Sequence, residues 1–292
     1  MRYLILLMIA IVSIGCSSHK KDKAITDREA LQAKYDSYRT IMLTVADSDG
    51  FVDTDKCDSL MNTALGNETA NIFAAEVSDG RWLRRPPTYS DCYSTKSSAS
   101  DISRDMLLGV MYRCVASNNL DCLKRMWHYG EVHSWSMGVN GPEHSIFTPD
   151  YIALLAQSIY KASDGSNNYA ARYFKFPTLT PKSGFEAQLQ AIFMIVRGIV
   201  YGGDSLDDNL TAKLAEQNLN NPLMQYVGEN YDAATKLLLN SWPNDRLPTS
   251  SDWCADWLLS EAPDGAGRKS CPDQADTHSG GDLLFVAKLL LE

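Results

Sequence analysis

Acidic side chains recur at the start of apolar segments along this 292-residue sequence. An aspartate opens each of the runs "DSLMN", "DMLLG" and "DLLFV"; these residues are Asp58, Asp105 and Asp282. Asp150 and Glu186 stand in similar positions. A carboxylate at the end of a buried helix must meet either a partner or a water-filled cavity, where it is available for a reaction. Each of these acids therefore either begins a helix or serves a reaction at the mouth of one.

Helix capping is the simpler interpretation. A serine stands two or three residues before three of the acids, at Ser103, Ser183 and Ser279. A serine cap contributes roughly 0.5–2 kcal/mol and a first-turn acid roughly 0.3–1 kcal/mol to helix stability. We expect at least two of the five acids to have no further role. Capping explains most of the five acids, but it explains less well why they precede the most apolar helices.

Helical periodicity runs through the whole sequence and predicts an all-α fold. Some segments are apolar on one face only, as in residues 31–45, 120–127 and 206–214. Others are apolar on nearly all sides: residues 105–116, 151–160, 189–201 and 282–291. Buried helices enclosed by amphipathic ones form two concentric layers, which predicts an α/α toroid. An irregular helical bundle is the alternative.

Two short segments resemble the six-hairpin (α/α)-barrel glycosidases and related polysaccharide-active enzymes. They are "SRDM" at residues 103–106 and Trp135 with Met137 and Gly138, and the general pattern extends over about residues 30–292. The resemblance implies one domain over 30–292, an incomplete or complete six-hairpin barrel with long functional loops.

The same resemblance implies hydrolysis of a glycosidic bond by two carboxyl groups. One donates a proton to the leaving oxygen, while the other activates water or attacks the sugar. One of them must therefore be protonated and the other ionised at the same pH. Asp58 and Asp105 are the predicted pair, and Asp282 is the next candidate.

Three long segments, residues 79–101, 131–149 and 240–280, are predicted loops, and loops of this length are usually functional. Aromatic side chains that could stack on sugar rings are Trp82, Tyr89, Trp135 and Trp242. Cations that could hold carboxylate or sulfate substituents are Arg84, Arg85 and Arg104. Histidines that could bind substrate or take part in catalysis are His133, His144 and His278. The alternative is that the loop tryptophans only pin these loops onto the body of the protein.

The N-terminus predicts export. Residues 1–15 combine Arg2 with an apolar core that is typical of a signal peptide and too short to span a membrane. Cys16 follows small residues, which resembles a bacterial lipobox and implies lipidation of this cysteine. Residues 16–29 then form a polar tether. We expect a lipid-anchored protein of the cell envelope, at the periplasmic or outer-membrane face, with a plain secretory signal as the alternative.

Six cysteines follow Cys16, and an even number in an oxidising compartment suggests disulfides. Pairing of neighbours along the chain is the simplest arrangement. It joins Cys57 to Cys92, Cys114 to Cys122, and Cys254 to Cys271. No cluster of cysteine and histidine has the spacing of a zinc site, and we predict neither a metal nor a cofactor.

The formal net charge of −9 disfavours nucleic acid as a partner and anionic lipid as a surface, apart from the lipid anchor. The predicted function is that of an exported enzyme that cleaves a glycosidic bond in a polysaccharide or oligosaccharide. A polysaccharide lyase on the same scaffold is one alternative, with Tyr89, His133 or His144 as base beside Arg84. A non-enzymatic surface lipoprotein that binds a glycan or a protein partner is the other.

Overall fold

The computed structural model describes residues 26–44, 46–51, 59–78, 80–84, 86, 102–138, 146–166, 179–182, 184–201, 208–217, 219, 221–241 and 281–292. Most of these residues are helical, which confirms the predicted all-α class. The strands in this part of the chain are the short antiparallel pair β1 (Glu76–Ser78) and β2 (Arg81–Trp82).

The helical elements follow in chain order. They are residues 26–44, α2 (Ser59–Gly66), the 3-10 turn η1 (Ile72–Ala75), α4 (Arg104–Ala116), α5 (Leu120–Val132), α7 (Pro149–Ala162), α8 (Gly184–Tyr201), α9 (Asp208–Gln217), α10 (Pro222–Val227), α11 (Tyr231–Ser241) and α14 (Gly281–Leu291). Within these elements, no helix is both long enough and apolar enough to cross a membrane.

The helices differ in how much of their surface they bury, as the sequence predicts. Helix α5 is one-sided: Leu123 and Met126 are fully buried, whereas His128 is exposed. Helix α7 instead buries nine consecutive residues, Tyr151 to Ile159, and therefore has other elements on most of its sides. The central residues of α4 and α14 are buried in the same way.

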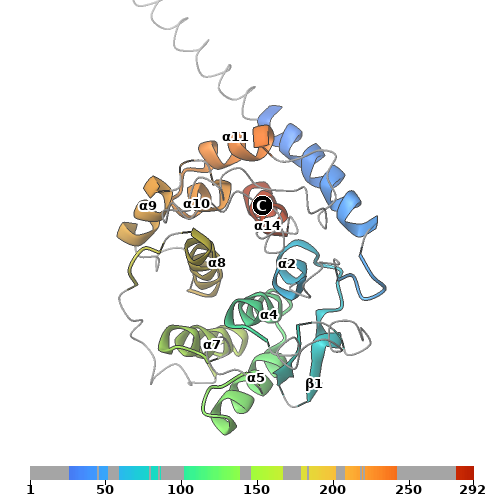
Figure 1. Ribbon diagram of the computed structural model, residues 1–292, viewed down its shortest axis with the longest axis vertical. Helices are drawn as coiled ribbons and strands as arrows, with labels where there is room; N and C mark the ends of the chain where they lie inside the picture. The colour runs from blue at the N-terminus through green and yellow to red at the C-terminus, as the bar shows by residue number, and fades with distance from the viewer. Residues whose placement is uncertain are drawn as a thin grey trace, which may run out of the picture.

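The more buried helices pack against one another. Helix α2 contacts α4 and α14, α7 contacts α4 and α8, and α10 contacts α8 and α14. In Figure 1, α2, α4, α8, α10 and α14 surround the centre of the molecule, while residues 26–44, α9 and α11 lie at its periphery. One continuous hydrophobic core joins all of these helices.

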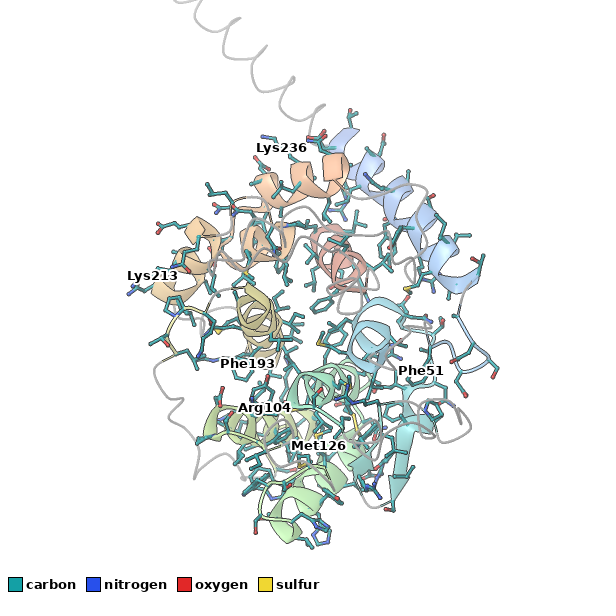
Figure 2. All side chains as sticks on the ribbon, viewed as in Figure 1. Phe51, Arg104, Met126, Phe193, Lys213 and Lys236 are labelled. Atoms are coloured by element: carbon teal, nitrogen blue, oxygen red, sulfur yellow. A yellow bond between two sulfur atoms is a disulfide. The ribbon has the colours of Figure 1, made fainter. Side chains whose placement is uncertain are left out.

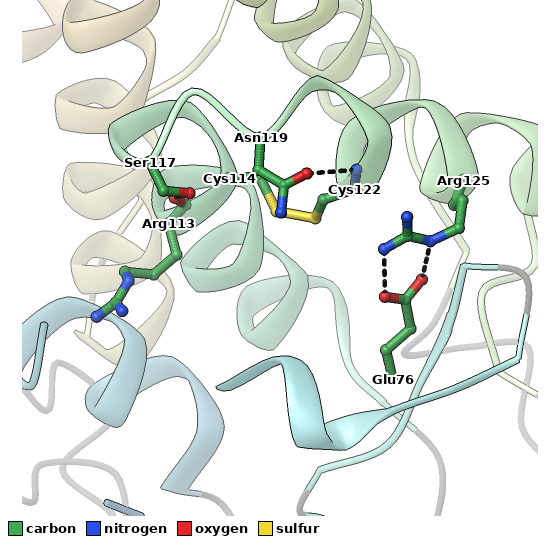
Figure 3. Close-up of a disulfide and its surroundings, with 7 residues drawn as sticks. All are labelled: Glu76, Arg113, Cys114, Ser117, Asn119, Cys122 and Arg125. Carbon is green, nitrogen blue, oxygen red and sulfur yellow. Dashed lines mark hydrogen bonds and ion pairs between the residues drawn. A yellow bond between two sulfur atoms is a disulfide. The ribbon is translucent and has the colours of Figure 1, made fainter. Parts of the chain in front are cut away.

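A disulfide between Cys114 and Cys122 closes the turn between α4 and α5 (Figure 3). The two Cα atoms are 6.1 Å apart, and both residues are fully buried. The Asn119 side chain caps α5 by accepting a hydrogen bond from the backbone N–H of Cys122. This finding confirms the predicted pairing of Cys114 with Cys122. The other predicted pairs, Cys57–Cys92 and Cys254–Cys271, lie outside the described residues, as does Cys16.

Replacing both Cys114 and Cys122 by alanine should lower the free energy of unfolding by about 2.5 kcal/mol. The bond closes a loop with a sequence separation of 8, and loop-closure entropy in the unfolded chain accounts for an effect of this size. Urea denaturation of the double variant and the wild type measures the difference. Equal midpoints in the two proteins would contradict a structural role for this bond.

A bidentate ion pair ties β1 to α5. Arg125 Nε donates to Glu76 Oε1 at 2.7 Å, and Arg125 Nη2 donates to Glu76 Oε2 at 2.6 Å (Figure 3). Gly80 lies against the same stretch of α5, since a Cβ atom at this position would meet the Arg125 carbonyl oxygen at 2.1 Å. The ion pair at Glu76 and the close packing of Gly80 therefore hold the segment before Trp82 and Arg84 against α5.

Candidate functional site

Helices α2 and α4 run in the same direction. Gly109 of α4 faces the middle of α2, because a Cβ atom on Gly109 would lie 3.0 Å from Met61 Cα. One turn later, the Arg113 guanidinium donates to the carbonyl oxygens of Asn67 and Glu68, directly after the end of α2. Later residues of α4 thus meet later residues of α2, so the two helices start at the same end.

Helix α14 joins this pair in the same direction. Its Phe285 packs edge-on against Tyr112 of α4, with ring centroids 4.9 Å apart. Lys288 Nζ, in its last turn, donates to Glu68 Oε2 at 2.8 Å. The last turns of α2, α4 and α14 line one pocket, and the starts of the three helices therefore lie at the opposite end.

Two predicted catalytic acids occupy these starts. Asp105 is the second residue of α4, and Asp282 is the second residue of α14. Asp58 directly precedes Ser59, the first residue of α2, and lies outside the described residues. Helices α4 and α14, which both pack against α2, thus begin with an Arg–Asp and a Gly–Asp pair.

The prediction that Ser103 caps α4 with its side chain is wrong. Ser103 has the extended backbone of an N-cap residue, with φ −98° and ψ 163°, but its side chain makes no capping hydrogen bond. Ser183 and Ser279 lie outside the described residues. The start of α4, where Asp105 lies, is therefore not stabilised by a serine cap.

Helices α7 and α8 also run in parallel. Tyr151, near the start of α7, lies against Phe193 with ring centroids 5.2 Å apart, and Lys161 in its last turn donates to the Ile199 carbonyl near the end of α8. Asp150 is the second residue of α7 and is partly exposed. This acid is a helix-start residue on a second pair of parallel helices.

Two polar candidates, one arginine and one histidine, remain accessible. Arg104 is the first residue of α4 and is partly exposed (Figure 2). His133 is exposed at the C-cap of α5, where its ring stacks on Tyr129 with a centroid distance of 4.1 Å. Both side chains keep polar atoms available to a ligand, as their predicted roles require.

Trp135 is held against α5. Its ring meets Trp127 edge-on, with centroids 4.8 Å apart, and a Cβ atom on Gly130 would lie 2.5 Å from Trp135 Cε3. Trp135 has a positive φ of 64°, and its carbonyl oxygen accepts a hydrogen bond from the Phe147 N–H. The side chain is partly exposed, so this tryptophan pins its loop and still offers some ring surface.

Trp82 is a core residue, which corrects the prediction that it stacks on a sugar. Its side chain is 1% exposed and packs against Phe73, with ring centroids 6.1 Å apart. No face of a ring buried to this extent is left for a ligand. The alternative interpretation, a tryptophan that anchors its loop, fits this position, and Arg84 two residues later is partly exposed.

Several predicted binding residues lie outside the described residues, namely Tyr89, His144, Trp242 and His278, together with Arg85. In the part of the chain that the structure describes, no group of three or more histidine, cysteine, aspartate or glutamate side chains could hold a metal ion.

The pocket at the ends of α2, α4 and α14 was not predicted from the sequence. The hydrogen bond from Lys288 lowers the pKa of Glu68 below its usual value. Partial burial is the largest single effect on the pKa of Lys288 and lowers it, but the hydrogen bond to Glu68 and the charges of Tyr112, Glu68 and Glu292 together outweigh burial and raise this pKa. Both pKa shifts favour the charged forms, as expected for an ion pair between Glu68 and Lys288. The sequence signal was a basic residue in the last turn of α14, which is favourable for any helix and therefore unspecific.

Comparison with known proteins gives no match. No protein-family model matches the sequence, and neither a curated protein nor a solved structure matches the chain.

Proposed function

We propose that this protein is an exported, glycan-active enzyme on an α/α toroid that hydrolyses glycosidic bonds with carboxyl groups at the starts of its inner helices. The order of helix contacts supports the toroid. Helices α2, α4, α8, α10 and α14 contact one another in this order, and α14 contacts α2 again, while α7 packs against both α4 and α8. A closed circuit of this kind is what an inner ring of helices requires.

One observation carries the proposed chemistry: α4 and α14 both pack against α2, and the last turns of the three helices line the same pocket. Their starts consequently lie away from this pocket, about 20 Å away for the 13 residues of α4. Asp105 and Asp282 are in the first turns of α4 and α14, and Asp58 directly precedes α2 in the sequence. This arrangement supports a shared site of Asp105 and Asp282 at the end of the molecule away from the pocket.

Acids gathered in this way suit acid–base catalysis. Each helix N-terminus stabilises an ionised carboxylate, whereas neighbouring carboxylates disfavour one another's ionisation. In a site where two such carboxyl groups lie close together, the second effect would leave one of them protonated at a pH where the other is ionised. A proton donor and a base or nucleophile are the two roles that glycoside hydrolysis needs.

The protein purified with its native disulfides should release new reducing ends from at least one member of a panel of neutral and uronate-containing polysaccharides. The ultraviolet absorbance of each reaction separates the mechanisms, because a lyase produces an unsaturated sugar and a hydrolase does not. A rise in ultraviolet absorbance together with the reducing ends would mean that the enzyme is a lyase and not a hydrolase. Retention of a glycan without any cleavage would favour the binding lipoprotein.

The proposed lipid anchor has its own test. Wild-type protein expressed in a bacterium should partition into the detergent phase, and Cys16→Ala should move it to the aqueous phase. Lipid on this cysteine would be the cause, since residues 17–29 carry no comparable apolar run. Wild-type protein found wholly in the aqueous phase would contradict the anchor and leave a secretory signal in its place.

A further inference from the structure

A cavity of about 190 Å³ opens where α2, α4 and α14 end, beside the helix of residues 26–44. Its polar lining consists of Tyr35, Glu68, Tyr112, Arg113, Ser117 and Lys288. With about 30 Å³ per water molecule, the cavity has room for roughly six waters, and it is smaller than the ~300–1,000 Å³ typical of drug-sized ligands. A ligand of this size is a single small ring rather than a chain.

The charges around the cavity compensate one another. Arg113 donates to the carbonyl oxygens of Asn67, Glu68 and Ala70, so its charge faces the negative end of α2. Lys288 is paired with Glu68. Arg39 and Asp36 lie close enough to Tyr35 to change its pKa in opposite directions. Glu292 adds a further negative charge near Tyr112. This balance does not attract a multivalent anion and favours an uncharged ligand.

The remaining groups suit a ligand rich in hydroxyl groups. Burial raises the pKa values of Tyr35 and Tyr112, so both phenols are neutral near pH 7 and each can donate and accept a hydrogen bond. Lys288 has three N–H donors, of which Glu68 Oε2 takes one. The two phenol rings and Ala64, Leu65 and Ala116 add apolar surface. A lining with both polar and apolar groups matches the hydroxyl groups and C–H face of a sugar.

We propose that this cavity binds one neutral sugar residue, as a second glycan contact at the end of the molecule opposite the proposed catalytic acids. The site would hold the tip or a branch of a glycan without cleaving it. It is separate from the cleavage site, and it can exist whether or not the chain is an enzyme.

Ala116 provides the test, because it is exposed, lies in the last turn of α4 and lines the cavity. Ala116→Phe should fill the cavity, and Ala116→Ser is the matched control. Binding of glucose, N-acetylglucosamine and glucuronate is measured by saturation-transfer NMR, with inorganic phosphate as a competitor. At least one neutral sugar should bind to the wild type and the serine variant, and at least ten-fold more weakly to the phenylalanine variant. Tyr112→Phe, which keeps the ring on Phe285, should weaken binding several-fold.

Three results would overturn the proposal: no neutral sugar binds, binding is equal in the two Ala116 variants, or phosphate displaces the sugar at equal concentration. Circular dichroism of Ala116→Phe checks that the variant is folded. Asp105→Asn should retain this binding, and Ala116→Phe should retain cleavage of short oligosaccharides. Failure of the sugar site and failure of the proposed hydrolase are therefore distinguishable.

Discussion

Asp105→Asn should reduce glycan cleavage by roughly 10²–10⁴-fold and leave the protein folded. Asparagine can neither donate the proton nor carry the charge that a general acid or base supplies, and losses of this size are typical for such groups. The same change removes a first-turn charge from α4, which costs about 1 kcal/mol or less. Initial rates of reducing-end release and the thermal midpoint, measured on the same preparation, separate the two effects.

Asp121→Asn is the matched control. Asp121 is also a first-turn acid, but it is exposed on the amphipathic helix α5, which begins at the disulfide-closed turn after the end of α4. Its replacement should change stability by a similar small amount and leave the cleavage rate unchanged. Equal cleavage rates in Asp105→Asn and Asp121→Asn would mean that Asp105 has no role beyond the start of its helix. Asp282→Asn, at the start of α14 on the other side of α2, tests whether the two acids act together.

The sequence predicted those parts of the fold that depend on local pattern. The continuous apolar run of residues 151–160 became the nine buried residues of α7, because a helix without a polar face must be covered on most sides. The pairing of Cys114 with Cys122 followed from a short connection between two helices, which brings their ends close together. In both cases the decisive contacts lie within one or two consecutive elements.

Contacts between distant segments could not be predicted in this way. Glu68 and Lys288 are 220 residues apart, and only the packing of α14 against α2 brings them together. Trp82 was assigned to substrate binding because it stands among loop residues, yet Phe73 and the core cover it. A single sequence reports the type of a side chain and its local spacing, whereas its exposure depends on which other segments pack against it.

Arg113→Met should lower the free energy of unfolding by about 3 kcal/mol, the largest stability loss that we predict for a single partly exposed residue. The guanidinium donates to three carbonyl oxygens at and after the end of α2: those of Asn67 at 2.7 Å, Glu68 at 2.6 Å and Ala70 at 3.3 Å. Hydrogen bonds from a charged donor contribute roughly 1.5–3 kcal/mol each, and partial access to water reduces the sum. Methionine keeps much of the apolar stem but offers no donor. Urea denaturation of the variant and the wild type measures the loss.

Two further variants separate the hydrogen bonds from the charge of Arg113. Arg113→Lys keeps a positive charge at the negative end of α2 but not the planar fork that reaches several carbonyl oxygens at once, so it should recover only part of the loss. Lys213→Met, on the exposed face of α9 (Figure 2), removes a cation from the surface and should change stability by less than about 0.5 kcal/mol. Full recovery in Arg113→Lys would mean that charge alone matters here. A loss in Arg113→Met no larger than that in Lys213→Met would mean that Arg113 does not hold α4 to the end of α2, and the parallel arrangement of these helices would then depend on their apolar contacts alone.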